Sequence, residues 1–208
     1  MASHNNLHSQ RAWARLAGLM YWVVLVVDLT GMNLRPSNLH SSLMLSGSLF
    51  TVLLALGLYY AVRPVQAMLA LTALACRLTE AGLGVVSCVA GFPSVHPRLA
   101  NSSLGSTLLQ LASWGDSTNF AAFIFAVGST IFFALFLKAR SIPRIIAIWG
   151  LFSSVLALSA CLAHLVWPAF PSMTMWAWMP MLLAETSTGL WLLIKSVKVA
   201  SPGGTERT

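Results

Sequence analysis

Long apolar runs separated by short polar connections occupy almost the whole chain. Six runs approach or exceed the roughly 20 apolar residues that a helix needs to cross a bilayer, at about 13–31, 43–62, 65–90, 118–138, 143–167 and 174–194. The pattern predicts an all-α, polytopic integral membrane protein in which residues 13–196 form a six-transmembrane-helix bundle. Residues 1–12 are then an N-terminal tail, and residues 197–208 are a tail expected to be disordered because of Ser201-Pro202-Gly203-Gly204.

One connection, residues 91–117, is long enough to hold structure of its own. Pro93 and Pro97 interrupt its start, and helical spacing then relates Leu104, Leu108, Leu111 and Trp114. This spacing predicts a short amphipathic helix on the membrane surface, in the outer loop between spans three and four. Asp116 comes just before the fourth span, where an N-cap is expected, and capping is favoured over a role in a pocket.

Composition and charge narrow the class and set the orientation. Charged residues make up only 8% of the chain, whereas a soluble domain carries about 25%. With the N-terminus inside, nine Lys and Arg residues lie on the cytoplasmic side, against Arg35 and Arg98 outside and Arg77 within a span. This bias predicts a multi-pass cell-membrane protein with both termini in the cytoplasm. The net charge of +7 does not indicate nucleic-acid binding, because the basic residues lie at the ends of apolar runs.

Ionisable residues inside the spans are the candidate functional groups. A charge at mid-bilayer costs roughly 2.5–3.5 kcal/mol on insertion scales, so such groups usually face a bundle interior or a polar cavity. Arg77 and Glu185 lie near the middle of spans three and six, Glu80 lies one turn outward from Arg77, and Asp28 and His164 lie in the outer parts of spans one and five. Their depth predicts a shared cavity open toward the outer side.

Each of these residues also has a purely structural interpretation. Arg77 and Glu80, three residues apart, can neutralise each other on one helix face, and this role is as well supported as a functional one. Asp28 can reach the headgroups or cap its helix, and His164 can be an interfacial residue. Glu185 has no basic neighbour in its own span. It must meet Arg77 across the bundle, bind a cation or keep its proton, which makes it the strongest functional candidate.

No cofactor or metal motif is present. Glu80, Glu185, His164 and Asp116 offer ligand atoms, but no spacing such as HxxxH supports a metal site. The aromatic residues are more informative: anchoring at the lipid interface is the favoured explanation for most of the tryptophans, but Trp149 and Trp191 lie at other depths and can line a pocket. An aromatic pocket with a carboxylic acid can protonate an alkene or epoxide and stabilise the cation that forms.

Several short motifs that follow one another along the chain together suggest a family. They are Arg15–Leu19, Arg77–Ala81, Gly128-Ser129, Arg140–Arg144 leading to Trp149-Gly150, and Glu185 followed by Gly189–Leu193. With these motifs the chain resembles the bacterial membrane family named domain of unknown function 4386. The family has no assigned activity, so the resemblance implies the six-helix architecture and no chemistry.

Three functions compete at this point. The first is a membrane enzyme that cyclises or isomerises a lipophilic, isoprenoid-like substrate, with Glu185 or Glu80 as general acid and Arg77 tuning the acidity of its partner. The second is a proton-coupled carrier with proton sites at Glu185 and Asp28, which with six spans is expected to form a homodimer. The third is a non-catalytic stress, immunity or assembly component of the bilayer.

Overall fold

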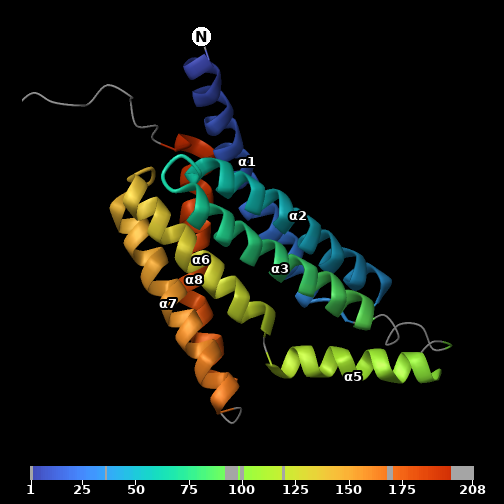
Figure 1. Cartoon of the computed structure of the whole chain (residues 1–208). Coiled ribbons are helices and arrows are strands. Elements are labelled where there is room, and N and C mark those ends of the chain that lie inside the picture. Colours follow the sequence, from blue (N-terminus) through green and yellow to red (C-terminus); the bar gives the residue numbers. More distant parts are fainter. Residues whose placement is uncertain are drawn as a thin grey trace, which may run out of the picture.

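The chain folds into helices throughout the part that the computed structural model describes (Figure 1). The described residues are 2–35, 37–91, 98, 101–118, 120–167 and 171–197, and the side chains of 2–8, 112, 114–118 and 171–175 are not described. Seven helices lie in these ranges: α1 (Ala2–Met32), α2 (Asn38–Val62), α3 (Ala67–Gly91), α5 (Ser103–Thr118), α6 (Phe120–Ala139), α7 (Arg144–Val166) and α8 (Pro171–Lys195). The all-helical prediction is therefore confirmed. Pro93, Pro97 and the tail at 198–208 lie outside the described residues.

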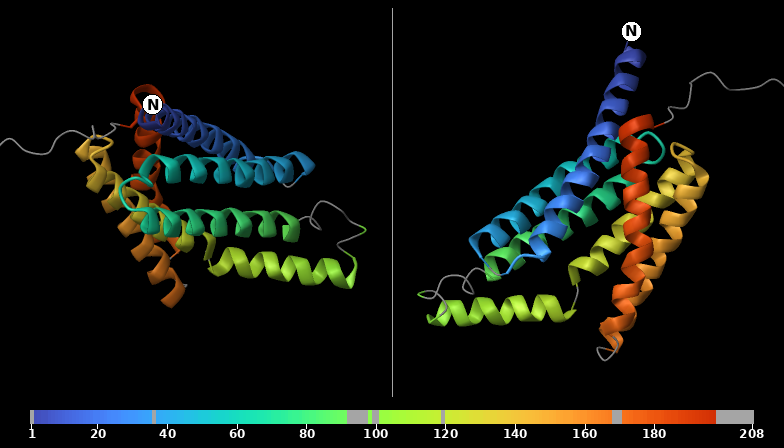
Figure 2. Two further views of the ribbon diagram at one scale, coloured as in Figure 1. Left: turned by 45° about the horizontal axis from the view of Figure 1, so that its top comes forward. Right: turned by 180° about the vertical axis from the view of Figure 1, so that it is seen from behind.

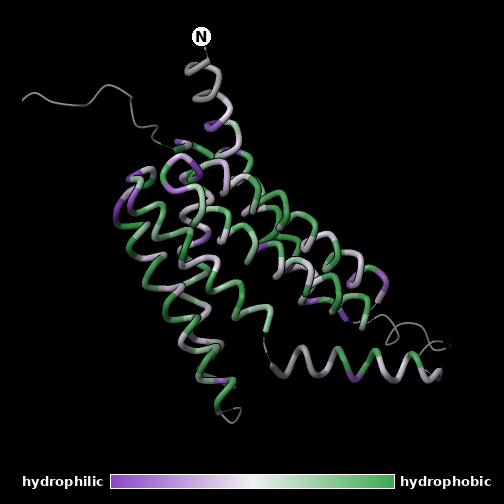
Figure 3. Tube along the Cα trace, in the orientation of Figure 1, coloured by the Kyte–Doolittle hydropathy of each residue, from purple (hydrophilic) through white to green (hydrophobic). Residues whose placement is uncertain are grey.

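Five helices are long and apolar enough to cross a membrane. They are the Ser9–Met32 part of α1, together with α2, α3, α6 and α7. The chain is therefore a multi-pass membrane protein. Figure 3 shows the apolar residues along these helices and hydrophilic residues at turns such as that between α6 and α7. α8 is equally long but is not among the five; Glu185 and three hydroxyl residues in its second half lower its hydropathy. Residues 2–12, assigned above to a tail, form the first turns of α1.

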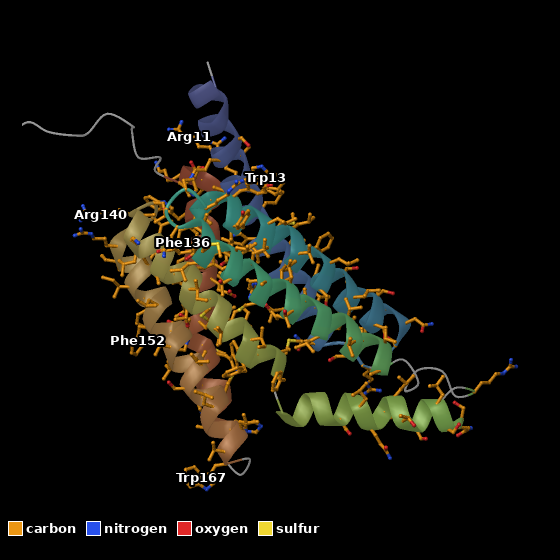
Figure 4. All side chains as sticks on the ribbon, in the orientation of Figure 1. Arg11, Trp13, Phe136, Arg140, Phe152 and Trp167 are labelled. Carbon is orange, nitrogen blue, oxygen red and sulfur yellow. The ribbon has the colours of Figure 1, made fainter. Side chains whose placement is uncertain are left out.

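The six long helices form a closed ring in which each contacts the next. The order is α1, α2, α3, α6, α7, α8 and back to α1. Both described chain ends lie at one end of the bundle (Figure 2), where the Ser196 hydroxyl donates a hydrogen bond of 3.1 Å to the Arg11 carbonyl. The α2–α3 and α6–α7 turns lie at that end too, since Lys138 donates to the Gln66 side chain at 3.1 Å. We call it the basic end; Figure 4 shows Arg11 and Arg140 there and Trp167 at the other end.

The contact between α1 and α8 depends on two glycines. In lipid, helices gain little hydrophobic free energy by associating, so small residues that allow close backbone approach favour packing. A Cβ atom on Gly18 would lie 2.7 Å from the Gly189 carbonyl oxygen, and one on Gly189 would lie 2.7 Å from Tyr21 Cβ. The two helices touch here, toward the basic end, and diverge toward the other end (Figure 2).

Large side chains close the basic half of the bundle. Phe133 and Phe136 of α6 are 2% and 1% exposed, and Leu58 and Val62 of α2 are 1% and 0% exposed. These residues fill the space between the helices at the basic end, and the cavity described below lies on the other half, where α1 and α8 separate.

Enlarging Gly18 should destabilise the bundle, and enlarging a glycine on the bundle surface should not. A Cβ on Gly82 would have nothing within 4 Å, so Gly82→Leu is the matched control. We expect Gly18→Leu to lower the thermal midpoint by several degrees in detergent, because overpacking typically costs about 1–3 kcal/mol. Gly82→Leu should leave it unchanged or raise it, since leucine favours a helix by up to about 1 kcal/mol over glycine. Equal effects of the two substitutions would contradict the assigned contact.

Candidate functional site

A cavity of about 570 Å³ opens between the diverging halves of α1 and α8. Its back wall comes from α3 and α6. Four of the lining residues carry a carboxyl or guanidinium group, namely Asp28, Arg77, Glu80 and Glu185. The rest of the lining is largely apolar or aromatic, including Tyr21, Leu25, Leu29, Phe125, Trp178 and Leu182. This volume is within the range of small-molecule sites, about 300–1,000 Å³.

Arg77 is the only cation among the lining residues, and it is already paired. Its Nη1 atom lies 2.9 Å from Glu80 Oε2, and the two side chains are 4% and 21% exposed. The spacing of three residues along α3 places both side chains on one face. The Arg77 guanidinium also lies over the Phe125 ring, 4.5 Å from its centroid, which adds a cation–π contact from α6. The pair is therefore a local, largely neutral unit on the back wall.

Glu185 faces the same cavity from α8 without a partner of this kind. Within the described residues it forms no hydrogen bond and no ion pair, although it interacts electrostatically with Arg77 and Glu80 across the cavity. Its position follows from the helix contact described above. Gly189 lies one turn along α8 and touches Tyr21, so Glu185 is held near Tyr21 at the point where α1 and α8 begin to separate.

Asp28 lies on the wall between this cavity and a second one. The second cavity, of about 540 Å³, lies among α1, α2 and α3 and shares Asp28 and Glu80 with the first. Its lining is richer in small and hydroxyl residues, among them Ser48, Thr51 and Ser87. Any Cβ on Gly47 would collide with Asp28 Oδ1, so the absence of a side chain at Gly47 makes room for this carboxyl.

The other candidate residues do not join the four. Trp149, Trp191 and His164 line neither of these two cavities. The Trp149 indole donates a hydrogen bond of 3.2 Å to the Pro180 carbonyl, and its side chain is 42% exposed on the outside of the α7–α8 pair. Trp191 follows Glu185 by six residues, which at about 100° per residue puts it on another face of α8. Asp116 lies in the last turn of α5 and not at the N-cap position of α6, and its side chain is not described.

Three aromatic residues of the site were not among the candidates. Tyr21 is 9% exposed and makes no hydrogen bond within the described residues; it precedes Asp28 by seven residues, two turns on the same face of α1, and this spacing is a signal that could have identified it. Phe125 and Trp178, whose ring centroids lie 5.5 Å apart, carry no such signal. An aromatic residue in a span resembles ordinary packing until the facing helix is known.

No metal site is visible in the described ranges. There, no three His, Cys, Asp or Glu side chains lie together in a way that could hold a metal ion. The arrangement instead offers a hydrogen-bond donor at Tyr21, one carboxyl paired with a guanidinium, and two carboxyls without partners. These groups can exchange protons with a molecule in the cavity.

Comparison with known proteins identifies a family and nothing closer. The family described as domain of unknown function (DUF4386) matches residues 38–196, which span α2 through α8. No curated protein and no solved structure matches the chain. The matched range includes Arg77, Glu80 and Glu185 and leaves out α1 with Asp28. Because the match covers well over half of the chain, the protein belongs to the DUF4386 family.

Proposed function

We propose that the protein is a membrane-embedded enzyme that performs acid–base chemistry on a lipophilic, isoprenoid-like substrate. The observation that supports this best is Glu185, a carboxyl without a hydrogen-bonding or ionic partner among the described residues, facing a largely apolar cavity. A carboxyl in such surroundings favours its neutral form, because burial disfavours the charge. Neutral and facing an apolar molecule, it is suited to donate a proton.

The proposed reaction is an isomerisation or cyclisation, which needs no co-reactant. The Glu185 carboxyl transfers its proton to one carbon of a C=C bond, forming a C–H bond and leaving a cation on the other carbon. In a cyclisation, the electron pair of a second C=C bond attacks this cation and closes a ring. Glu80, paired with Arg77 at 2.9 Å, serves as the base: it then removes a proton from the neighbouring carbon and restores a C=C bond. Proton exchange between the two carboxyls through water resets the site.

The two acidic side chains can hold different roles because their surroundings differ. One carboxyl is paired with a guanidinium and the other is not, and enzymes commonly separate an acid from a base in this way. The aromatic side chains of Tyr21 and Trp178 lie in the same cavity and can stabilise a transient cation through their π faces.

A carrier is the second candidate, and the position of the cavities favours the enzyme over it. A carrier needs a path to both sides of the membrane. The first cavity draws its α6 lining from Ala121, Ala122 and Phe125, and the second from Ala121 alone, all near the start of that helix. Phe133 and Phe136 fill the interior farther along the same helix. A cavity open at one end suits a substrate that enters from the bilayer and leaves the same way.

The topology belongs to the same proposal. We assign α8 as a sixth span because its 25 residues pack against both α1 and α7. The basic end then faces the cytoplasm with both termini, in accord with the distribution of Lys and Arg. α5 lies across the outer end beside α3 (Figure 1). Leu104 and Leu111 of α5 are 60% and 45% exposed, as expected of a helix that rests on the bilayer surface.

Replacing the Glu185 carboxyl with an amide should abolish conversion of the substrate. The test incubates the protein in phosphatidylcholine liposomes with a C20 polyprenol and with its terminal epoxide in D₂O, and analyses the products by mass spectrometry. We expect isomerised or cyclised product carrying deuterium on carbon. Glu185→Gln should reduce its formation at least about 100-fold, since a positioned general acid contributes about 10²–10⁴-fold.

Ser187→Ala is the matched control for this measurement. Ser187 lies two residues from Glu185, lines neither cavity and bonds only to its own helix backbone. The Ser187→Ala protein should convert the substrates at the wild-type rate. Unchanged turnover in Glu185→Gln, or no conversion of either substrate by the wild-type protein, would contradict the proposed enzyme.

The sixth span can be tested separately by labelling intact cells with a membrane-impermeant maleimide. In a background without native cysteines, Trp167→Cys and Lys195→Cys place thiols at exposed positions on either side of α8. We expect Trp167→Cys to react in intact cells, and Lys195→Cys to react only after the membrane is permeabilised. Arg140→Cys, in the turn between α6 and α7, should behave like Lys195→Cys. If Trp167→Cys and Lys195→Cys, which lie at opposite ends of α8, were labelled from the same side of the membrane, α8 would not be a span.

A further inference from the structure

The cavity between α1 and α8 has an excess of acidic groups. Its lining holds three carboxyls, from Asp28, Glu80 and Glu185, and one guanidinium, from Arg77. The guanidinium is paired with Glu80 and covered by the Phe125 ring. Asp28 and Glu185 have no hydrogen-bonding or ionic partner in the described part of the chain. In a medium of low dielectric such carboxyls must hold protons or meet a cation.

Tyr21 provides a second, independent sign of a ligand. Its side chain is 9% exposed, it lines the cavity, and it forms no hydrogen bond within the described residues. The Tyr21 hydroxyl oxygen is not among the fully buried polar atoms, so it remains accessible from the cavity and can meet a ligand there. Tyr21 and Glu185 both line this cavity, and Gly189, one turn along α8 from Glu185, touches Tyr21.

The remaining lining is suited to a hydrocarbon chain. Val24, Leu25 and Leu29 of α1 face Leu182 of α8 across the cavity. Leu29 and Met32, toward the outer end, are 47% and 72% exposed. The two helices α1 and α8 diverge here (Figure 2). Because these exposed residues also line the cavity, we infer that it opens to the bilayer between the two helices. Along α1 the polar residues Tyr21 and Asp28 lie on either side of Val24 and Leu25, and the lining ends on the apolar Leu29 and Met32.

We propose that this cavity binds a single-chain amphiphilic monocation drawn from the outer half of the bilayer. The cationic head lies between Asp28 and Glu185, against the rings of Tyr21 and Trp178, and the alkyl tail extends along α1 toward Met32. Carboxylates and aromatic faces together are the groups that bind quaternary ammonium ions. The inference deepens the proposed function and rests on it for the substrate, since a cation formed from an alkene would occupy the same place as the ammonium head.

Binding of radiolabelled dodecyltrimethylammonium to the protein in phosphatidylcholine nanodiscs tests this inference, with empty nanodiscs subtracted. A fixed positive charge is used because it cannot act as a proton donor. We expect saturable binding of one molecule per chain. Unlabelled 1-dodecanol, dodecyl sulfate and tetramethylammonium should each compete at least tenfold more weakly, because each lacks either the positive charge or the tail.

The variants assign the binding to the named carboxyls. Glu185→Gln and Asp28→Asn should each weaken binding at least tenfold, while Ser187→Ala should stay within twofold of the wild type. The ligand series on the wild-type protein needs no variant, so the test remains decisive if a substitution prevents folding. The inference is overturned if 1-dodecanol competes as well as the ammonium, if Glu185→Gln binds normally, or if binding does not exceed that of empty nanodiscs.

The outcome is distinct from that of the turnover experiment. Selective ammonium binding by a protein that converts neither polyprenol would remove the proposed enzyme and leave a cation site. Conversion of the polyprenol without any preference for the ammonium would support the enzyme and remove the cation site.

Discussion

The close approach of α1 and α8 at Gly18 and Gly189 is the contact on which the rest of the structure depends. It closes the ring of six helices, and a side chain on either glycine would force the two backbones apart. The same contact determines where the helices begin to diverge, and therefore where the cavity starts. Because Gly189 touches Tyr21 and lies one turn from Glu185, helix packing and the candidate chemistry are set by the same few residues.

Ion pairing then gives the two glutamates different character. Glu80 shares a helix with Arg77 and forms its ion pair within α3. Such a pair can form before the bundle assembles and lowers the cost of inserting both charges. Glu185 meets Arg77 only across the assembled bundle and without a direct ion pair. A carboxyl kept in this state costs stability, and proteins tend to concentrate such costs at functional sites. This asymmetry underlies both the proposed acid–base roles and the proposed cation site.

The sequence predicted the helices well and the site only in part. Bilayer thickness imposes a length on each span, so α2 and α7 lie close to the predicted 43–62 and 143–167. The start of α1 was not anticipated, because a polar segment without proline or glycine can continue a helix beyond the membrane. Depth along the spans grouped Asp28, Arg77, Glu80 and Glu185. Depth does not give the rotation of each helix, which is set by contacts such as Gly18–Gly189. For that reason Tyr21 was missed, and Trp149 and Trp191 were assigned to a pocket that they do not line.

The difference in charge between the two glutamates is the central claim, and infrared spectroscopy tests it most directly. A protonated carboxylic acid has a C=O stretching band that an ionised carboxylate lacks. For the protein in phosphatidylcholine bilayers at neutral pH, we expect such a band from Glu185 and from Asp28, which also lacks a partner. The band should lose its Glu185 component in Glu185→Gln and keep its full intensity in Glu80→Gln. Absence of the band in the wild type, or its reduction in Glu80→Gln with full retention in Glu185→Gln, would contradict the assigned difference between the two glutamates.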